Sequence, residues 1–159
     1  MLLILGLFGL VKSNYKAFIG FHYVLILASL LVGISTLLFQ QGLLSPLYWM
    51  ILVGFGLYAC YVPFNCIFFD RMIATFKIEG NAGYLIYIAD SFGYLGSMAV
   101  LLYKNFGKPN SSWLQFFIGS TYCIAFLGFG ISIVSMLYFR KKYRSSKFTV
   151  EIKIPIMNG

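Results

Sequence analysis

The sequence has very little charge. Only 10% of its 159 residues are Asp, Glu, Lys or Arg, and only four of these are acidic. A soluble domain carries about 25% charged residues, so a chain this poor in charge could not cover its surface with polar groups. One histidine and three cysteines are present, with no Cys-X-X-Cys pair, which leaves no spacing typical of a metal site or a disulfide framework. The composition excludes a soluble enzyme, a secreted disulfide scaffold and a disordered chain.

Long apolar runs make up most of the chain. Hydrophobic residues account for 60% of the sequence, and the mean hydropathy is +0.87. Runs of about 18 residues or more can cross a bilayer as helices, since a helix rises ~1.5 Å per residue. Four such runs occupy residues 17–39, 46–69, 84–103 and 113–139. Open strands cannot satisfy their backbone in lipid, so the expected fold class is all-α, a polytopic transmembrane helix bundle.

The two ends of the chain differ from these runs. Residues 1–11 are apolar but too few to span, and they lack the basic segment and the cleavage site of a signal peptide. We interpret them as the second half of a helix, which would make this chain the tail end of a longer gene product. An interfacial or re-entrant segment is the alternative. Residues 1–144 would form a membrane domain and residues 145–159 a cytoplasmic tail, in which alternating apolar residues over 148–154 predict a short strand that needs a partner.

The basic residues are unevenly distributed along the chain. The net charge is +8, but the basic residues lie between apolar runs or in the tail, where they would meet lipid headgroups rather than nucleic acid. Two of them, Lys104 and Lys108, follow the third run. The other ten lie before the first run, between the second and third runs, or after the fourth. Since successive runs cross the membrane in opposite directions, all ten lie on the same side of it: Lys12, Lys16, Arg71, Lys77, Arg140, Lys141, Lys142, Arg144, Lys147 and Lys153. By the positive-inside rule, that side and the C-terminus face the cytoplasm.

Each apolar run carries a stripe of small or polar residues at helical spacing. The stripe of the first run contains His22, Ser29, Gly33, Thr36 and Gln40, and that of the fourth contains Thr121, Ala125, Gly128, Ser132 and Ser135. Small residues let membrane helices approach closely, so both stripes are expected to pack against other helices. The three cysteines are interpreted as buried small hydrophobic residues, and they are Cys60, Cys66 and Cys123.

The stripes of the second and third runs contain tyrosines, an amide and a carboxylate, which helix packing alone does not require. Their candidates for a substrate or proton pathway are Tyr58, Tyr61, Asn65, Tyr87, Asp90 and Tyr94. Asp90 is central to this set, because a charge near the middle of a membrane helix costs roughly 2.5–3.5 kcal/mol. Tyr87 and Tyr94 lie three residues before it and four after it, which is close enough to donate hydrogen bonds. The carboxylate would couple protons or contact substrate, or it would tie two helices together structurally.

Other residues allow a functional and a structural interpretation. His22 is a candidate proton relay or a polar packing residue. Pro63 predicts a bend in the second run, which occurs at transporter binding sites and also as an ordinary kink. After that run, Asp70, Arg71 and Glu79 would form a cytoplasmic gate that holds two helices together, or a solvated anchoring loop.

Two segments carry a family resemblance. YVPFNCIFFDR at residues 61–71 and GNAGYLIYIADSFGYLGS at residues 80–97 resemble a family of uncharacterised bacterial multi-pass membrane proteins related loosely to the major facilitator superfamily. The resemblance implies that the four runs are the last four helices of a twelve-helix transporter, so that the fold is similar to its C-terminal half. It also implies a location in the bacterial inner membrane.

The function expected from these observations is part of a facilitator-like secondary transporter for an unknown solute. One half of such a transporter does not complete a midplane site, so the chain would need a missing N-terminal half or a second copy besides the lipid bilayer. The alternative is a small non-transporting membrane scaffold or assembly partner. No catalytic activity, cofactor, metal or nucleic-acid partner is expected, since no Ser/His/Asp or His/Glu set is present in the spans.

Overall fold

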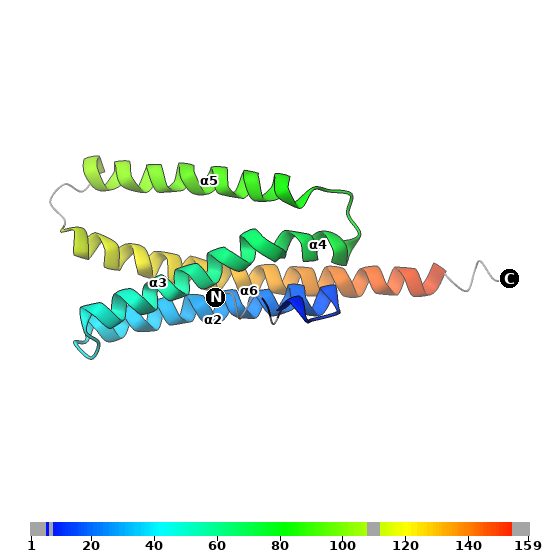
Figure 1. Ribbon diagram of the computed structural model, residues 1–159, viewed down its shortest axis with the longest axis horizontal. Coiled ribbons are helices and arrows are strands. Elements are labelled where there is room, and N and C mark those ends of the chain that lie inside the picture. Colours follow the sequence, from blue (N-terminus) through cyan, green and yellow to red (C-terminus); the bar gives the residue numbers. More distant parts are fainter. Residues whose placement is uncertain (1–5, 7, 108–111, 154–159) are drawn as a thin grey trace.

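In a computed structural model of the protein, residues 6, 8–107 and 112–153 are described, with side chains described as far as residue 145. The described part is helical and contains no strand (Figure 1). Its long α-helices are α2 (Asn14–Gln40), α3 (Pro46–Pro63), α5 (Ala82–Leu102) and α6 (Trp113–Lys153). A short helix, α4 (Phe69–Phe76), and two π-helices, η1 (Phe64–Phe68) and η2 (Tyr103–Gly107), complete the set.

Four helical segments are long and apolar enough to cross a membrane. They are Asn14–Gln40, Pro46–Phe76, Ala82–Gly107 and Trp113–Ser145. Each contains one of the four predicted runs and extends it at one or both ends, so the predicted all-α membrane bundle is confirmed. Residues 1–5 and 7 of the predicted partial helix lie outside the described residues.

Local sequence signals explain where these helices begin. The Ser13 side chain accepts a hydrogen bond from the Lys16 backbone N–H at 3.4 Å at the start of α2. Asn81 does the same for Gly83 at 2.9 Å at the start of α5. α3 begins with Pro46, whose ring is tolerated there because the first helical N–H groups have no intrahelical partner.

The C-terminal segment corrects one prediction. The strand expected over 148–154 is wrong, because the backbone of α6 stays helical as far as Lys153. A lone strand leaves its backbone groups unpaired, whereas a helix satisfies them within the segment. α6 is therefore about 60 Å long at ~1.5 Å per residue, and it extends well past the other helices (Figure 1).

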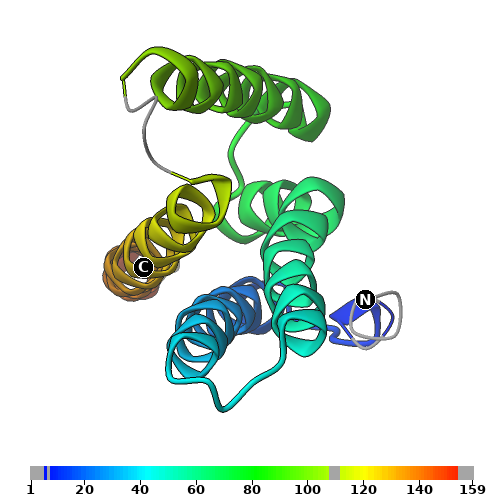
Figure 2. The ribbon, with the colours of Figure 1, turned by 90° about the vertical axis from the view of Figure 1, so that its left-hand side faces the viewer.

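α2 is the centre of the bundle, and α5 stands apart from it. α2 packs along both α3 and α6, and α4 also contacts it. Figure 2 shows α5 separated from this group, and no residue of α5 is buried. The core forms two clusters, one around Phe18 and Phe68 and the other around Val32, Trp49 and Val53.

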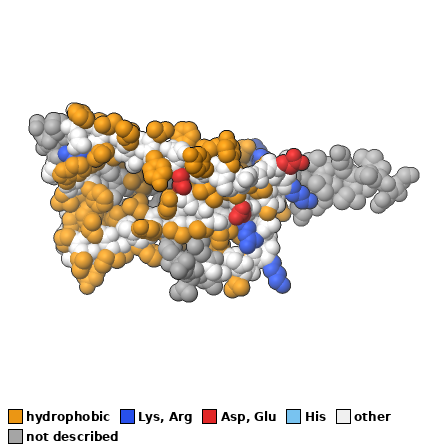
Figure 3. All heavy atoms as spheres, turned by 45° about the horizontal axis from the view of Figure 1, so that its top comes forward, with side chains coloured by type: hydrophobic (Ala, Val, Ile, Leu, Met, Phe, Trp, Pro, Cys, Tyr) orange, Lys and Arg blue, Asp and Glu red, His pale blue; other side chains and the backbone are white. Residues whose placement is uncertain are grey.

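The surface divides into an apolar side and a basic end. In Figure 3, hydrophobic side chains cover most of the visible flank, while Lys and Arg side chains gather mainly toward the end from which α6 extends. The cysteines are a second correction, since Cys66 and Cys123 are exposed and Cys60 is only partly buried. Cys123 lines a cavity that α5 borders, so its exposure does not place it on a bare outer face of the bundle.

Candidate functional site

The predicted stripes of α2 and α6 face each other. His22 is 1% exposed, and its Nδ1 lies 3.0 Å from the Phe18 carbonyl oxygen while its Nε2 lies 3.1 Å from Ser135 Oγ. A carbonyl can only accept, so Nδ1 carries the proton and a neutral Nε2 accepts from the Ser135 hydroxyl. Both nitrogens of this histidine are satisfied by the protein, which matches the polar packing interpretation.

Small residues bring the two helices together further along the same seam. A methyl group on Gly128 would lie 2.7 Å from Ser29 Oγ, and one on Gly33 would lie 3.4 Å from the Ala125 side chain. The Ser29 hydroxyl donates to the Leu25 carbonyl at 2.8 Å, so it needs no partner across the seam. This arrangement agrees with close packing through small residues, as the two stripes predict.

Trp49 closes the opposite end of the seam, and apart from its size nothing in the sequence pattern marked it as important. It is 2% exposed and stacks on Phe39 with ring centroids 4.1 Å apart. Its indole N–H donates to Thr36 Oγ1 at 3.2 Å, and Thr36 donates to the Val32 carbonyl. The tryptophan joins α3 to α2 where three helices meet.

The predicted site on the second and third spans contains one direct bond. Asn65 Nδ2 donates to Asp90 Oδ1 at 3.2 Å, and both residues are partly buried. Asn65 lies on the π-helix η1, which begins directly after Pro63. Figure 1 shows that the chain changes direction here, between α3 and α4. π-Helices are rare and frequently occur at functional sites.

The four tyrosines predicted to share this site lie elsewhere. Tyr87 and Tyr94 are 73% and 76% exposed, and neither donates to Asp90 among the described contacts. Tyr58 and Tyr61 are also exposed. The structure therefore brings together the amide and the carboxylate of the predicted set, and it leaves the four phenol rings available to whatever surrounds the bundle.

The structure places the three gate candidates in different surroundings. Arg71 Nη1 donates to Asn14 Oδ1 at 2.6 Å, which ties α4 to the first residue of α2. Asp70 and Glu79 are exposed, and neither forms an ion pair with a described side chain. Lys77, which ends α4, adopts φ +50°, an uncommon conformation for a residue with a side chain. Among the described residues, the contact that ties these two helices together is therefore a hydrogen bond from arginine to asparagine and not an ion pair.

Comparison with protein families adds one match. A model described as a family of unknown function, DUF5690, matches residues 1–142. The chain belongs to the DUF5690 family. No curated protein and no solved structure matches it.

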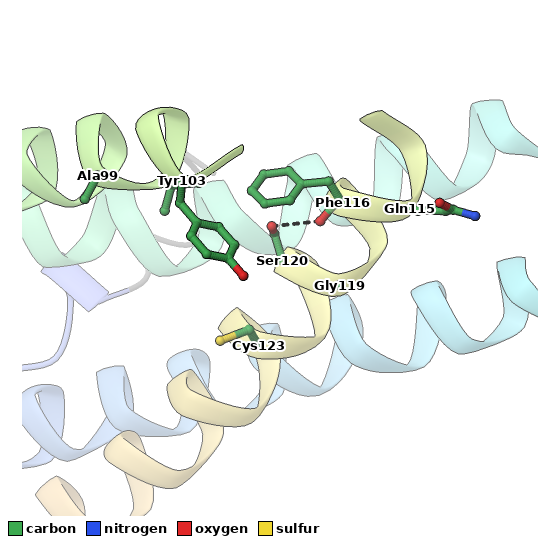
Figure 4. Close-up of a pocket in the computed structure, with 8 residues that line it drawn as sticks. Ala99, Tyr103, Gln115, Phe116, Gly119, Ser120 and Cys123 are labelled. Carbon is green, nitrogen blue, oxygen red and sulfur yellow. Dashed lines mark hydrogen bonds between the residues drawn. The ribbon is translucent and has the colours of Figure 1, made fainter. Parts of the chain in front are cut away.

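A lateral cavity of about 600 Å³ lies between the end of α5 and the start of α6. Figure 4 shows Tyr103 and Phe116 facing each other across it, with Cys123 further along α6. The Ser120 hydroxyl is already used, since it donates to the Phe116 carbonyl at 2.8 Å. The lining is mainly apolar, as expected for a space that opens toward lipid.

Lys104 lies beside this cavity, directly after the third predicted run. It belongs to η2, is 5% exposed, and its Nζ lies 4.8 Å from the centre of the Trp113 ring. A cation over an aromatic face is stabilised by about 0.5–2 kcal/mol. Trp113 was the available signal, because tryptophan at the end of a span is typical of the membrane interface.

Proposed function

We propose that this DUF5690 protein is part of a facilitator-like secondary transporter in the bacterial inner membrane, with its C-terminus in the cytoplasm. Asn65 and Asp90 are its coupling pair. The observation that carries the proposal is the bond between a carboxylate inside one span and an amide on a π-helix of another. A carboxylate within a membrane is costly, and irregular backbone at membrane depth favours a binding or gating position.

The exchange chemistry follows from this bond. An ionised Asp90 accepts a hydrogen from the Asn65 amide at 3.2 Å. Protonation removes part of that attraction and converts one carboxyl oxygen into a donor. Because Asn65 sits where α3 gives way to η1 and α4, weakening the bond would free α5 to shift against this break. The same carboxyl could bind a cationic or hydroxyl-bearing solute in place of the amide.

A complete transport site would include more helices than these four. α5 has no buried residue, and its tyrosines at positions 87 and 94 are exposed. Phenol groups within a bilayer are better satisfied against protein or water than against lipid tails. We expect a further helical unit, either a separate half or a second copy, to cover this face and to supply the other side of the pathway.

Substitution of Asp90 tests the coupling role. Membrane vesicles from cells that express the protein would be loaded with pyranine and given panels of sugars, amino acids and nucleosides, with solute-induced acidification as the readout. Asp90→Asn should reduce the response at least tenfold, because an amide cannot exchange the proton. Ser91→Ala is the matched control, since Ser91 lies on the same turn, is exposed and donates only to the Tyr87 carbonyl. Full activity of Asp90→Asn would contradict the proposal.

Purified protein tests the need for a further unit. Vesicles that contain only this polypeptide as a proven monomer should show no coupled flux, and robust flux would overturn that requirement.

The scaffold alternative is favoured by a different observation. Asp90 already has a partner within the chain, and α5 offers a whole uncovered helix for another membrane protein. A scaffold predicts that Asp90→Asn lowers thermal stability and leaves the activity of the partner unchanged. A transporter predicts loss of flux with little change in stability, so measuring both on the same variant separates the two functions.

A further inference from the structure

A second cavity lies at the basic end of the molecule, and neither Asn65 nor Asp90 is among the residues that line it. Its volume is about 640 Å³, within the range of about 300–1,000 Å³ that small-molecule sites occupy. It is lined by Tyr15, Leu137, Arg140, Lys141, Tyr143 and Arg144. Five of these residues come from α6, and Tyr15 comes from the start of α2.

The cavity has a fixed wall. The rings of Tyr15 and Tyr143 stack with centroids 3.8 Å apart and planes 11° apart. This stack joins the second residue of α2 to α6, so the wall does not depend on a single flexible side chain. Both phenol hydroxyls can donate hydrogen bonds to an anion.

Three cations lie on the same side of α6. Positions 137, 140, 141 and 144 follow one helix face at spacings of three, one and three. Arg140, Lys141 and Arg144 are exposed, and none forms an ion pair with a described carboxylate. Leu137 lies one turn nearer the middle of the span. The cavity thus changes from apolar to cationic along the helix, at the end of the candidate span Trp113–Ser145.

We propose that this cavity binds an anionic phospholipid whose headgroup carries two phosphates. Arginine binds phosphate in a bidentate manner, and basic pockets beside membrane helices suit polyanionic headgroups. Two phosphates match three cations better than one does, and Leu137 provides a surface for the first part of an acyl chain. By contrast, a row of basic residues that only fixes the orientation of the protein would need neither a cavity nor the tyrosine stack.

Lipid titration of the purified full-length chain in detergent tests the proposal. The probes are cardiolipin with two phosphates, phosphatidylglycerol with one, and pyrophosphate without acyl chains. Binding is followed by native mass spectrometry and by the shift in unfolding temperature. We expect saturable binding of one cardiolipin, at least tenfold tighter than phosphatidylglycerol. Pyrophosphate binding as tightly as cardiolipin would show a soluble anion to be the ligand and would overturn the lipid assignment.

Two triple variants separate a site from general attraction. Arg140→Gln/Lys141→Gln/Arg144→Gln removes the cations of the cavity and should weaken cardiolipin binding at least tenfold. Lys12→Gln/Lys77→Gln/Lys142→Gln removes the same charge outside the cavity and should change binding less than twofold. Equal losses in both variants, or no loss in the first, would overturn the proposal.

The tyrosine wall gives an independent check. Tyr15→Leu removes the stack without changing the charge and should reduce the preference for cardiolipin over phosphatidylglycerol, whereas Tyr15→Phe keeps the ring and should retain most of it. Equal preference in both variants and the wild type would show that the wall plays no part.

Discussion

His22 shows how a polar residue is accommodated inside this bundle. One of its nitrogens donates to a backbone carbonyl and the other accepts from a serine 113 positions later. A buried polar group is tolerated when each of its hydrogen-bonding atoms has a partner. The bond to Ser135 is therefore a specific link between α2 and α6, beyond the contact of their small residues.

A double-mutant cycle measures this link. His22→Leu should destabilise the protein by about 1–3 kcal/mol, because both hydrogen bonds of the imidazole are removed and Ser135 loses its partner. Ser135→Ala should have a smaller effect, and the coupling between the two should be about 0.5–1.5 kcal/mol. Unfolding in mixed micelles with increasing SDS provides the free energies. Additive effects would show that the 3.1 Å contact contributes nothing specific.

At the level of helices, α3 and α2 meet at a glycine. A methyl group on Gly56 would lie 2.5 Å from Val32 Cγ2 and 3.2 Å from the Ala28 carbonyl oxygen, whereas one on Gly54 would meet nothing within 4 Å. Val32 is itself buried, and its branched side chain has little freedom to move within a helix. Glycine is therefore needed for close packing at position 56, whereas position 54 has space for a larger side chain.

Alanine substitutions at these two glycines should give opposite results. Gly56→Ala should destabilise the protein by about 1–3 kcal/mol through overpacking. Gly54→Ala should be neutral or stabilising by up to about 1 kcal/mol, because alanine favours the helix. Thermal unfolding in detergent compares the two variants directly. A stable Gly56→Ala protein would mean that α3 does not pack this closely on α2.

The sequence predicted the positions of the helices better than the side-chain contacts between them. Spacings of three and four were sufficient to find the stripes of α2 and α6, because both helices are regular there, but they did not show that the two stripes face each other. The partner of Asp90 was harder to identify, since Asn65 lies on a π-helix, where the phase of an α-helix no longer applies. The alternation over 148–154 was misleading because period two shows only which side chains alternate, and it provides no second strand.

The whole molecule has two chemically different ends. The connection from α2 to α3 lies at one end, while the start of α2, the connection from α4 to α5 and the extension of α6 lie at the other (Figure 1). Most basic side chains are at the second end (Figure 3). The positive-inside rule predicts that this end faces the cytoplasm. A reagent that cannot cross the membrane should then reach each end of the molecule from one side only.

Thiol labelling tests this orientation. In a background with Cys60, Cys66 and Cys123 replaced by alanine, a membrane-impermeant maleimide should label Gln41→Cys in right-side-out vesicles. It should label Lys77→Cys only in inside-out vesicles. The reverse pattern would invert the orientation, and labelling of both from one side would contradict the number of spans between them.

The pairing of α2 with α6 also has a consequence for biogenesis. Ribosomes add about 5–20 residues per second, so Ser135 is made on the order of ten seconds after His22. During that interval α2 enters the bilayer before α6 exists, so the His22 imidazole lacks the serine that later bonds its Nε2, whereas the Ser29 and Thr36 hydroxyls already donate within α2. We therefore expect this face of α2 to stay against the insertion machinery until α6 has been made, and a chain arrested before α6 to be recognised by membrane quality control.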